Sequence, residues 1–417
     1  MTDPPLARRL GLADAVLIGL GSMVGAGVFS AFAPAAAVAG AGLLIGLAIA
    51  GAVAYCNATA SAQLAAQYPV SGGTYVYGRE RLGNWWGFIA GWGFVIGKTA
   101  SCAAMALTFA AYAVPTPWQR PAAVAAVVTL AAVNYRGITR TAWLTRVIVG
   151  LVLFVLTVTV IAALTGAPHD IAHVVEEPIG NVGPHGVLQS AGLLFFTFAG
   201  YARIATMGEE VRDPRRTIPR AIVTALAIAV ALYAVVALTV LLVLGPRRLA
   251  TSRAPLADAV AVGSWAWAVP VIAVGGSAAA LGALLALIAG VGRTTLAMAR
   301  HADLPRWLGA VHPRHQVPHR AEITVAVVVS ALVLTVDLRD AIGFSSFGVL
   351  LYYLVANISA FTQSPAQRRF PRWLQVVGAA GCLLLVATLP WQAVLAGLLV
   401  CAIGVIYRAV RLVPSRG

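Results

Sequence analysis

Long apolar runs separated by short polar stretches make up most of the chain. About 20 apolar residues are enough to cross a bilayer as an α-helix, and most of the runs reach that length. Backbone groups in lipid must form their hydrogen bonds internally, and the sequence lacks the ten-residue alternating strands of a membrane barrel, so we expect helices. The pattern predicts an all-α polytopic membrane protein with about twelve transmembrane helices, at approximately 11–36, 40–66, 84–114, 119–134, 141–166, 186–210, 218–244, 265–296, 321–337, 340–362, 373–389 and 391–410.

The composition agrees with this prediction and excludes other classes of protein. Hydrophobic residues make up 60% of the chain and charged residues 10%, whereas soluble domains are roughly 45–50% apolar and 25% charged. A soluble enzyme, a disordered chain and a secreted disulfide scaffold are therefore excluded. The first run follows Arg8 and Arg9 and contains Ala-x-Ala triplets, as a signal peptide does. It is longer than a signal-peptide core, and we interpret it as the first helix.

The cysteines and histidines indicate neither a metal site nor a cofactor, and we expect none. The four cysteines lie far apart within apolar runs and lack zinc-type spacing, so we interpret them as small buried side chains. A membrane haem protein needs histidine within its spans, whereas all seven histidines lie in two polar stretches. His312, His315 and His319 are close together in one of these stretches, which we interpret as a solvated loop.

The net charge of +15 reflects the membrane topology of the chain and does not indicate binding to nucleic acid. With the N-terminus inside, 22 of the 29 basic residues fall in cytoplasmic segments and 5 in outer segments, as the positive-inside rule requires. We therefore expect an integral protein of the cytoplasmic membrane that contacts lipid and not nucleic acid, with both termini in the cytoplasm. The two remaining basic residues, Lys98 and Arg203, lie within predicted spans.

Two spans contain sequence that weakens a helix. The first has Gly21, Gly25 and Gly27 within seven residues, and each glycine costs a helix roughly 1 kcal/mol relative to alanine. The sixth has Gly200 among aromatic residues. Interrupted helices at corresponding positions of the two halves of a chain indicate a secondary transporter with its substrate site at the membrane midplane. The positive end of one half-helix and the negative end of another can bind the two opposite charges of a zwitterion there. Close packing of small residues is the alternative for the first span, through Gly21-x-x-x-Gly25.

The chain resembles the amino acid–polyamine–organocation permease superfamily over nearly its whole length. The motifs that carry the resemblance are 25–29 (GAGVF), 68–77 (YPVSGGTYVY), 91–92 (GW), 195–220, and 293–305 with AMAR at 297–300. The resemblance implies a LeuT-type fold of five-plus-five inverted repeats with broken helices 1 and 6. The implied divisions are a first repeat at 1–166, a second repeat at 167–362, and helices 11 and 12 with the C-terminal tail at 363–417.

The resemblance also implies a substrate site. The amide groups around Ala26 and Gly27 would receive the substrate carboxylate, and the carbonyls of Phe196 and Ala199 its ammonium. Phe196 and Phe198 would act as aromatic gates, with core packing as the alternative. The implied substrate-binding residues are Ser22, Gly25, Ala26, Gly27, Thr99, Phe196, Phe198, Ala199, Gly200 and Arg203. The chain departs from the family at Ala202, where members often carry an acid, and at 149–153, where many proton-coupled relatives carry a lysine.

Lys98 is the only lysine of the chain. It lies roughly 21 Å along the third helix, too deep to reach either membrane surface, and a charge there costs a few kcal/mol. We hypothesise that Lys98 is a proton-coupling group near helices 1 and 8. Burial disfavours its ammonium form and would permit proton release during the cycle. The alternative is a permanently charged lysine facing carbonyls of a broken helix.

The other charges near the breaks leave alternatives open. Arg203 could bind the substrate carboxylate, bind an inner-gate acid, or line an inward vestibule. Asp14, Glu209 and Glu210 lie at similar depth near the inner mouth, by the rise of a helix. They are candidates for an inner gate, and solvated helix-end charge is the alternative.

These features predict a secondary active transporter that imports an amino acid by alternating access, with protons as the coupling ion. Lys98 and Arg203 favour a neutral substrate over a cationic one. A carrier or exchanger of polyamines or cationic amino acids remains the alternative. A membrane-embedded enzyme would need acids or histidines clustered within spans, and a passive channel would never concentrate its substrate.

Overall fold

The computed structural model describes residues 10–69, 72–137, 142–168, 171, 183–208 and 210–412. Helices make up most of these residues, and among them no β-strand forms beyond a single bridge between Leu10 and Val211. All twelve predicted spans are helical. The first is divided into α1 (Leu12–Met23), α2 (Ala26–Ser30) and α3 (Phe32–Ala39), and the others are α4 (Leu43–Gln67), α6 (Asn84–Ala113), α7 (Gln119–Tyr135), α8 (Ala142–Gly166), α10 (Gly183–Phe198), α12 (Pro214–Thr251), α14 (Val269–Arg300), α15 (His319–Thr335), α16 (Leu338–Phe361), α17 (Arg372–Thr388) and α18 (Trp391–Leu412).

Length and hydropathy identify most of these helices as membrane spans. Within the described residues, nine spans are long and apolar enough to cross a bilayer, and α17 is a shorter apolar helix. The helices α7 and α15, of 17 residues each, take the places of the fourth and ninth predicted spans. The prediction of an all-α membrane protein is therefore confirmed. Two shorter helices, α5 (Thr74–Leu82) and α13 (Pro255–Ala261), lie between spans.

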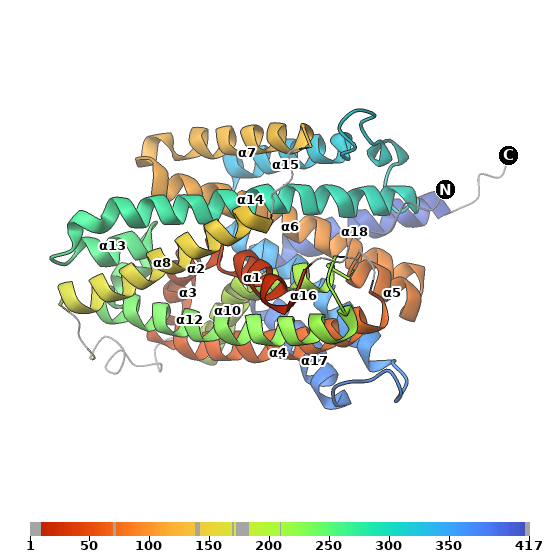
Figure 1. Cartoon of the computed structure of the whole chain (residues 1–417), viewed down its shortest axis with the longest axis horizontal. Helices are drawn as coiled ribbons and strands as arrows, with labels where there is room; N and C mark the ends of the chain where they lie inside the picture. The colour runs from red at the N-terminus through yellow and green to blue at the C-terminus, as the bar shows by residue number, and fades with distance from the viewer. Residues whose placement is uncertain are drawn as a thin grey trace.

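The long helices run along the long axis of the molecule, with α7 and α15 side by side along one edge (Figure 1). Helix α3, the last part of the first broken span, packs on α12, and α10, the first part of the second broken span, packs on α4. Likewise α6 packs on α14. Helices of the first half thus pack on helices of the second half, as an inverted repeat predicts. The repeat boundaries at 166 and 362 stay a prediction.

Both predicted interruptions fall where the glycines are. Helix α1 ends at Met23, and Val24 and Gly25 leave helical geometry (ψ 36° and −137°) before α2 begins at Ala26. Helix α10 ends at Phe198 and narrows into a 3₁₀ turn, η4 (Ala199–Tyr201), before the short helix α11 (Ala202–Ala205). The sixth span thus ends as a helix at Ala205, five residues earlier than predicted.

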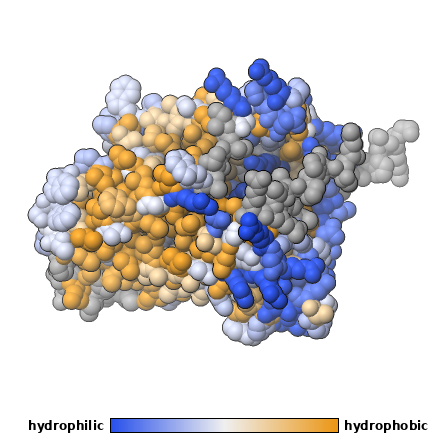
Figure 2. Space-filling model, in the orientation of Figure 1, coloured by the Kyte–Doolittle hydropathy of each residue, from blue (hydrophilic) through white to orange (hydrophobic). Residues whose placement is uncertain are grey.

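The surface matches a protein that spans a membrane. Apolar residues cover most of the face in Figure 2, and hydrophilic residues gather at one end, where α5 lies in Figure 1. Large apolar side chains are exposed along the outer helices, including Phe154 of α8 (59%) and Ile403 of α18 (63%). Soluble monomers rarely expose such continuous apolar surface. Arginines end the helices at the hydrophilic end, among them Arg81 of α5 and Arg300 of α14.

Candidate functional site

The two broken helices touch each other at their interruptions. A methyl group at position 200 would overlap the carbonyl of Ser22 and lie 2.6 Å from the amide nitrogen of Met23. One at position 27 would lie 3.0 Å from the Cα of Thr197. Glycine is thus required at position 200, where backbone approaches backbone, and a methyl group at position 27 would fit only if Thr197 shifted by a few tenths of an ångström. The predicted residues Ser22, Gly27 and Gly200 are brought together at this junction.

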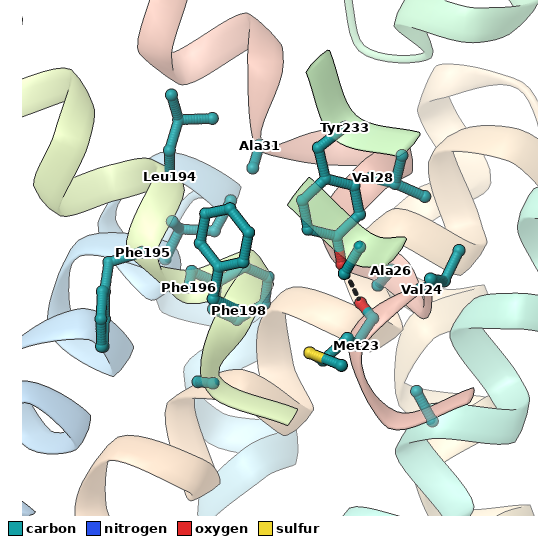
Figure 3. Close-up of a cluster of buried hydrophobic side chains, with 14 of the residues drawn as sticks. Met23, Val24, Ala26, Val28, Ala31, Leu194, Phe195, Phe196, Phe198 and Tyr233 are labelled. Carbon is teal, nitrogen blue, oxygen red and sulfur yellow. Dashed lines mark hydrogen bonds between the residues drawn. The ribbon is translucent and has the colours of Figure 1, made fainter. Parts of the chain in front are cut away.

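A tyrosine from α12 joins the ends of α1 and α10. The hydroxyl of Tyr233 lies 2.7 Å from the carbonyl oxygen of Met23 and 3.0 Å from that of Thr197, and Figure 3 shows the bond to Met23. Tyr233 is fully buried. Interrupting a helix leaves carbonyls without their intrahelical partners, and this hydroxyl donates to them.

Lys98 reaches the second interruption from α6. Its side chain is buried, and Nζ donates to the carbonyl of Ala199 at 3.3 Å. The hydroxyl of Tyr353, on α16, donates to the same carbonyl at 3.3 Å. The hydrogen bond of Lys98 thus goes to a carbonyl of the broken sixth helix, as in the alternative of a permanently charged lysine, whereas we expected Lys98 near helices 1 and 8. Its role in proton coupling stays a prediction. The carbonyl assigned to a substrate ammonium by resemblance already receives two donors.

Other predicted residues line the junction with fewer polar contacts. The hydroxyls of Ser22 and Thr99 bond back to the carbonyls of Ile18 and Val95 in their own helices. A methyl group at Gly25 would lie 2.9 Å from Cβ of Ala283, on α14. Ala26 begins α2 and is fully buried. Ser22, Gly25 and Ala26 belong to the first interruption or flank it, and a role of all four residues in substrate binding stays a prediction.

The two phenylalanines predicted as gates are both buried. The ring of Phe198 lies 5.2 Å from that of Tyr233, on α12, and its edge approaches Gly51, on α4. Phe196 is 7% exposed and is labelled in Figure 3 with Phe195 and Phe198, from the same stretch of α10. In this conformation Phe198 packs between neighbouring helices, which matches the core-packing alternative.

A small cavity lies beside the first interruption. It has a volume of about 10 Å³, lies between α1, α8 and α14, and is lined by Gly21, Val24, Ile148, Val149, Val152 and Ala279. Such a volume holds one water molecule at most, so this cavity does not accommodate an amino acid.

Two ion pairs lie at the predicted inner mouth. Asp14 of α1 pairs with Arg146 of α8. Arg203 of α11 lies 3.6 Å from Glu210 across a partly exposed contact, which matches the inner-gate alternative for this arginine. Backbone bonds from Leu10 to 210–212 hold the start of the first span beside the end of the sixth. The third predicted gate residue, Glu209, lies outside the described residues.

A buried charge cluster at the hydrophilic end was not predicted. Asp303, in the loop after α14, lies 3.0 Å from Arg79 of α5 and 2.6 Å from Arg408 of α18. Tyr75 donates to the same carboxylate at 2.8 Å. Burial, with the neighbouring Asp303, raises the pKa of Tyr75 above its usual value. Arg408 also lies over the ring of Trp85 at 4.8 Å.

The histidines of the polar loop surround one tyrosine. The rings of His312, His315 and His319 lie 5.3–6.2 Å from that of Tyr135, at the end of α7. Desolvation, His312 and nearby arginines lower the pKa of His315. Across the described ranges, no group of three histidines, cysteines or acids is arranged to hold a metal ion.

Sequence reasoning missed three buried tyrosines that form hydrogen bonds and one buried acid. Tyr233 and Tyr353 bond the interrupted helices, and Tyr112 of α6 donates to the carbonyl of Phe29 at 2.9 Å. Glu322, in the first turn of α15, is buried against Gly292. The available signal was a polar group in an apolar span, since a buried tyrosine hydroxyl usually finds a partner.

Known proteins with similar sequences are transporters. The chain is 60% identical to an uncharacterised transporter of Mycobacterium tuberculosis (strain ATCC 25618 / H37Rv), over 99% of this chain and 93% of that protein. It is 25% identical to a branched-chain amino acid permease of Bacillus subtilis (strain 168), over 97% and 93% of the two chains. It is 29% identical to cationic amino acid transporter 4 of Homo sapiens, over 84% of this chain and 59% of that protein.

These names describe transporters rather than enzymes, in agreement with the sequence-based prediction. Residues 10–411, nearly the whole chain, match the amino acid permease family. The long apolar helices and the two interrupted spans match this assignment. The chain therefore belongs to the amino acid permease family and is an integral membrane transporter.

Proposed function

We propose that this permease imports a neutral amino acid across the cytoplasmic membrane by proton symport. The observation that carries the proposal is Lys98, which is buried in α6 and donates to the Ala199 carbonyl at the interruption of the sixth span. An ionisable residue inside a membrane protein is costly and is usually functional. Lys98 is thus the group that binds and releases the coupling proton.

In the proposed cycle, protonated Lys98 ties α6 to η4 through the Ala199 carbonyl. Loss of the proton removes the charge from this contact and weakens it, because a charge-assisted hydrogen bond is stronger than a neutral one. The second half of the sixth span can then move relative to α6. Proton release is in this way coupled to the opening of the site.

The substrate would lie between the two interruptions. Its carboxylate would face the amide groups at the start of α2, around Ala26 and Gly27, where the helix dipole favours an anion. The Ala199 carbonyl is already shared by Lys98 and Tyr353, which leaves the Phe196 carbonyl for the substrate ammonium. The remaining predicted residues, Ser22, Gly25, Thr99 and Gly200, would shape the walls.

Access from the cytoplasm would be controlled by the two ion pairs at the inner mouth. Asp14–Arg146 links helices 1 and 5, and Arg203–Glu210 closes the end of the sixth span. We place both termini in the cytoplasm on the distribution of basic residues. The repeats at 1–166 and 167–362 would move as the two inverted halves of an alternating-access transporter.

Replacing Lys98 tests proton coupling. Lys98→Arg keeps a permanent positive charge, since arginine is not deprotonated in proteins, and Lys98→Ala removes the charge. Both should lose pH-gradient-driven accumulation of labelled amino acid in proteoliposomes, by about tenfold or more, because neither can release a proton. Full accumulation of the amino acid by Lys98→Arg would instead show that Lys98 is a permanently charged structural residue.

A substrate panel tests the neutral class. Labelled branched-chain amino acids, arginine, lysine and putrescine should be compared in the same vesicles, with and without the pH gradient. We expect the neutral amino acids to be taken up and the cations excluded, because Lys98 and Arg203 repel them. The names of the relatives include both classes. Preferential uptake of arginine or putrescine would replace this proposal with a cationic carrier.

A further inference from the structure

A row of uncharged polar side chains is buried where α4, α16 and α17 pack against one another. Each member is at most 2% exposed. We call this row the polar seam, and its members are Asn57, Ser61, Asn357, Gln363 and Gln375. Cys382 lies on the face of α17 that carries Gln375, and its thiol donates to Asn57 Oδ1 at 3.4 Å.

Hydrogen bonding within the seam is incomplete. Asn357 Nδ2 donates to Asn57 Oδ1 at 2.6 Å. Several other polar atoms have no hydrogen-bond partner among the described residues: Asn57 Nδ2, Ser61 Oγ, Asn357 Oδ1, Gln363 Oε1 and both amide atoms of Gln375. Buried polar groups are almost always satisfied by protein or by ordered water. Because these atoms are grouped along one interface, they can share water molecules, each of which makes about three hydrogen bonds.

The inner end of the seam meets the contact of Lys98. Asn357 Nδ2 lies 2.9 Å from the carbonyl of Tyr353. The hydroxyl of Tyr353 in turn donates to the Ala199 carbonyl, which is also the acceptor of Lys98. The seam therefore begins one helical turn from Tyr353, whose side chain reaches the interruption of the sixth span and the acceptor of Lys98.

The outer end of the seam reaches the surface. Gln363 Nε2 donates to Gln67, and Arg368 donates to the Gln363 carbonyl at 3.1 Å. Gln67 and Arg368 are partly exposed. Ten residues separate Tyr353 from Gln363, which is about 15 Å along a helix. Arg368 belongs to a segment that the distribution of basic residues places in the cytoplasm.

We propose that the polar seam holds a file of water molecules that carries the proton of Lys98 to the cytoplasm, apart from the path of the substrate. The proposal rests on the proton symport proposed above. In this step an Nζ–H bond of Lys98 breaks, the proton passes to a water of the file, and another proton leaves at the rim. The titratable groups beside Lys98 and along the route are Cys102, Tyr201, Tyr352, Tyr353, Cys56 and Cys382, and the charged group at the rim is Arg368.

Water in the seam is tested on the unmodified protein by hydroxyl-radical footprinting. Radicals formed from bound water label nearby sulfur, so buried Cys382 should be labelled. Met298 is equally buried but lies in an apolar cluster, and it serves as the control. Normalised to the denatured chain, labelling of Cys382 should exceed that of Met298 at least fivefold. Equal labelling would show a dry seam and overturn the proposal.

The proton route is tested by Gln375→Leu. Its side-chain atoms have no hydrogen-bond partner in the part of the chain that the structure describes, so the change removes none of the described hydrogen bonds while it replaces a polar group that can bind water. Accumulation driven by a pH gradient should fall at least fivefold, and substrate exchange, which needs no net proton release, should stay within twofold. Unchanged accumulation, or equal loss of both, would overturn the route.

A control variant and the Lys98 variants separate the possible failures. Asn134→Leu changes a buried amide of α7 that bonds to the Leu285 carbonyl, away from the seam, and should leave the ratio of accumulation to exchange unchanged. A falling ratio in this control would overturn the route as well. Full accumulation by Lys98→Ala would overturn proton coupling itself, whereas a dry seam overturns only the route.

Discussion

At the scale of single residues, the hydroxyl of Tyr233 should be the side-chain group on which the junction of the broken helices most depends. Tyr233→Phe leaves the buried carbonyls of Met23 and Thr197 without this donor. An unsatisfied buried polar group costs about 1–3 kcal/mol. We expect the free energy of unfolding to fall by about this amount, measured by thermal unfolding in detergent, and uptake to slow.

Tyr201→Phe is the matched control. Tyr201 is as deeply buried as Tyr233, but its hydroxyl lies beside that of Tyr353 and bonds no backbone carbonyl among the residues described here. Removing it leaves no backbone carbonyl without a donor and should therefore cost less stability than Tyr233→Phe. Equal destabilisation by the two variants would mean that the bridge from Tyr233 contributes nothing specific.

These residues show what a sequence reveals about single side chains. Lys98 could be identified because a charge in an apolar run is conspicuous. The partner of Lys98 was not predictable, because Ala199 is 101 positions away and offers only a backbone carbonyl. Tyr233 is 210 positions from Met23. A tyrosine in a span indicates that its hydroxyl needs an acceptor, but only the packing of helices decides which one.

At the scale of elements, the contact between α1 and η4 should not tolerate a side chain at position 200. In Gly200→Ala the new methyl group would overlap the Ser22 carbonyl, and backbone cannot turn aside as a flexible side chain can. Overpacking typically costs about 1–3 kcal/mol. We expect a lower unfolding temperature and at least a tenfold loss of uptake, because the two interruptions are forced apart.

Gly290→Ala, on α14, is the control for this element. A methyl group there has no heavy atom within 4 Å, and alanine favours a helix over glycine by roughly 1 kcal/mol. This variant should be as stable as the parent protein or more so, with uptake unchanged. If Gly200→Ala were also as stable and as active as the parent protein, the close contact between α1 and η4 would not be needed for transport.

The elements were the part of the fold that the sequence predicted best. Helices form at all twelve predicted spans, and nine spans among the described residues are long and apolar enough to cross a bilayer. Glycine located both interruptions. The seventh span was predicted to end at 244, before Gly245 and Pro246, and helical geometry is interrupted there, because Gly245 takes φ 67° and ψ 164°. A second helical segment follows and brings α12 to Thr251, and proline is well suited to the first turn of that segment. The break signal therefore located the end of the long helical segment but not the short one behind it.

At the scale of the whole molecule, the described structure joins segments that the sequence does not relate. The cluster around Asp303 connects α5, the loop after α14 and α18, so that helix 12 is tied to the first half of the protein. Sequence analysis placed these charges on one side of the membrane but not in contact. Counting charges gives topology, whereas pairing depends on the tertiary fold.

Asp303→Asn should loosen this end of the molecule. The carboxylate is 4% exposed and lies beside two arginines, and Arg408 is itself only 6% exposed. Removing one partner of a buried ion pair costs about 3–5 kcal/mol, because the other charge stays buried. Thermal unfolding should show this loss, and proteolysis at the end of α18 should become faster. Asp337→Asn breaks the pair with Arg120, in which the aspartate is 81% exposed, and should cost less than about 1 kcal/mol. Similar small losses in both variants would show that the cluster does not hold α18 in place.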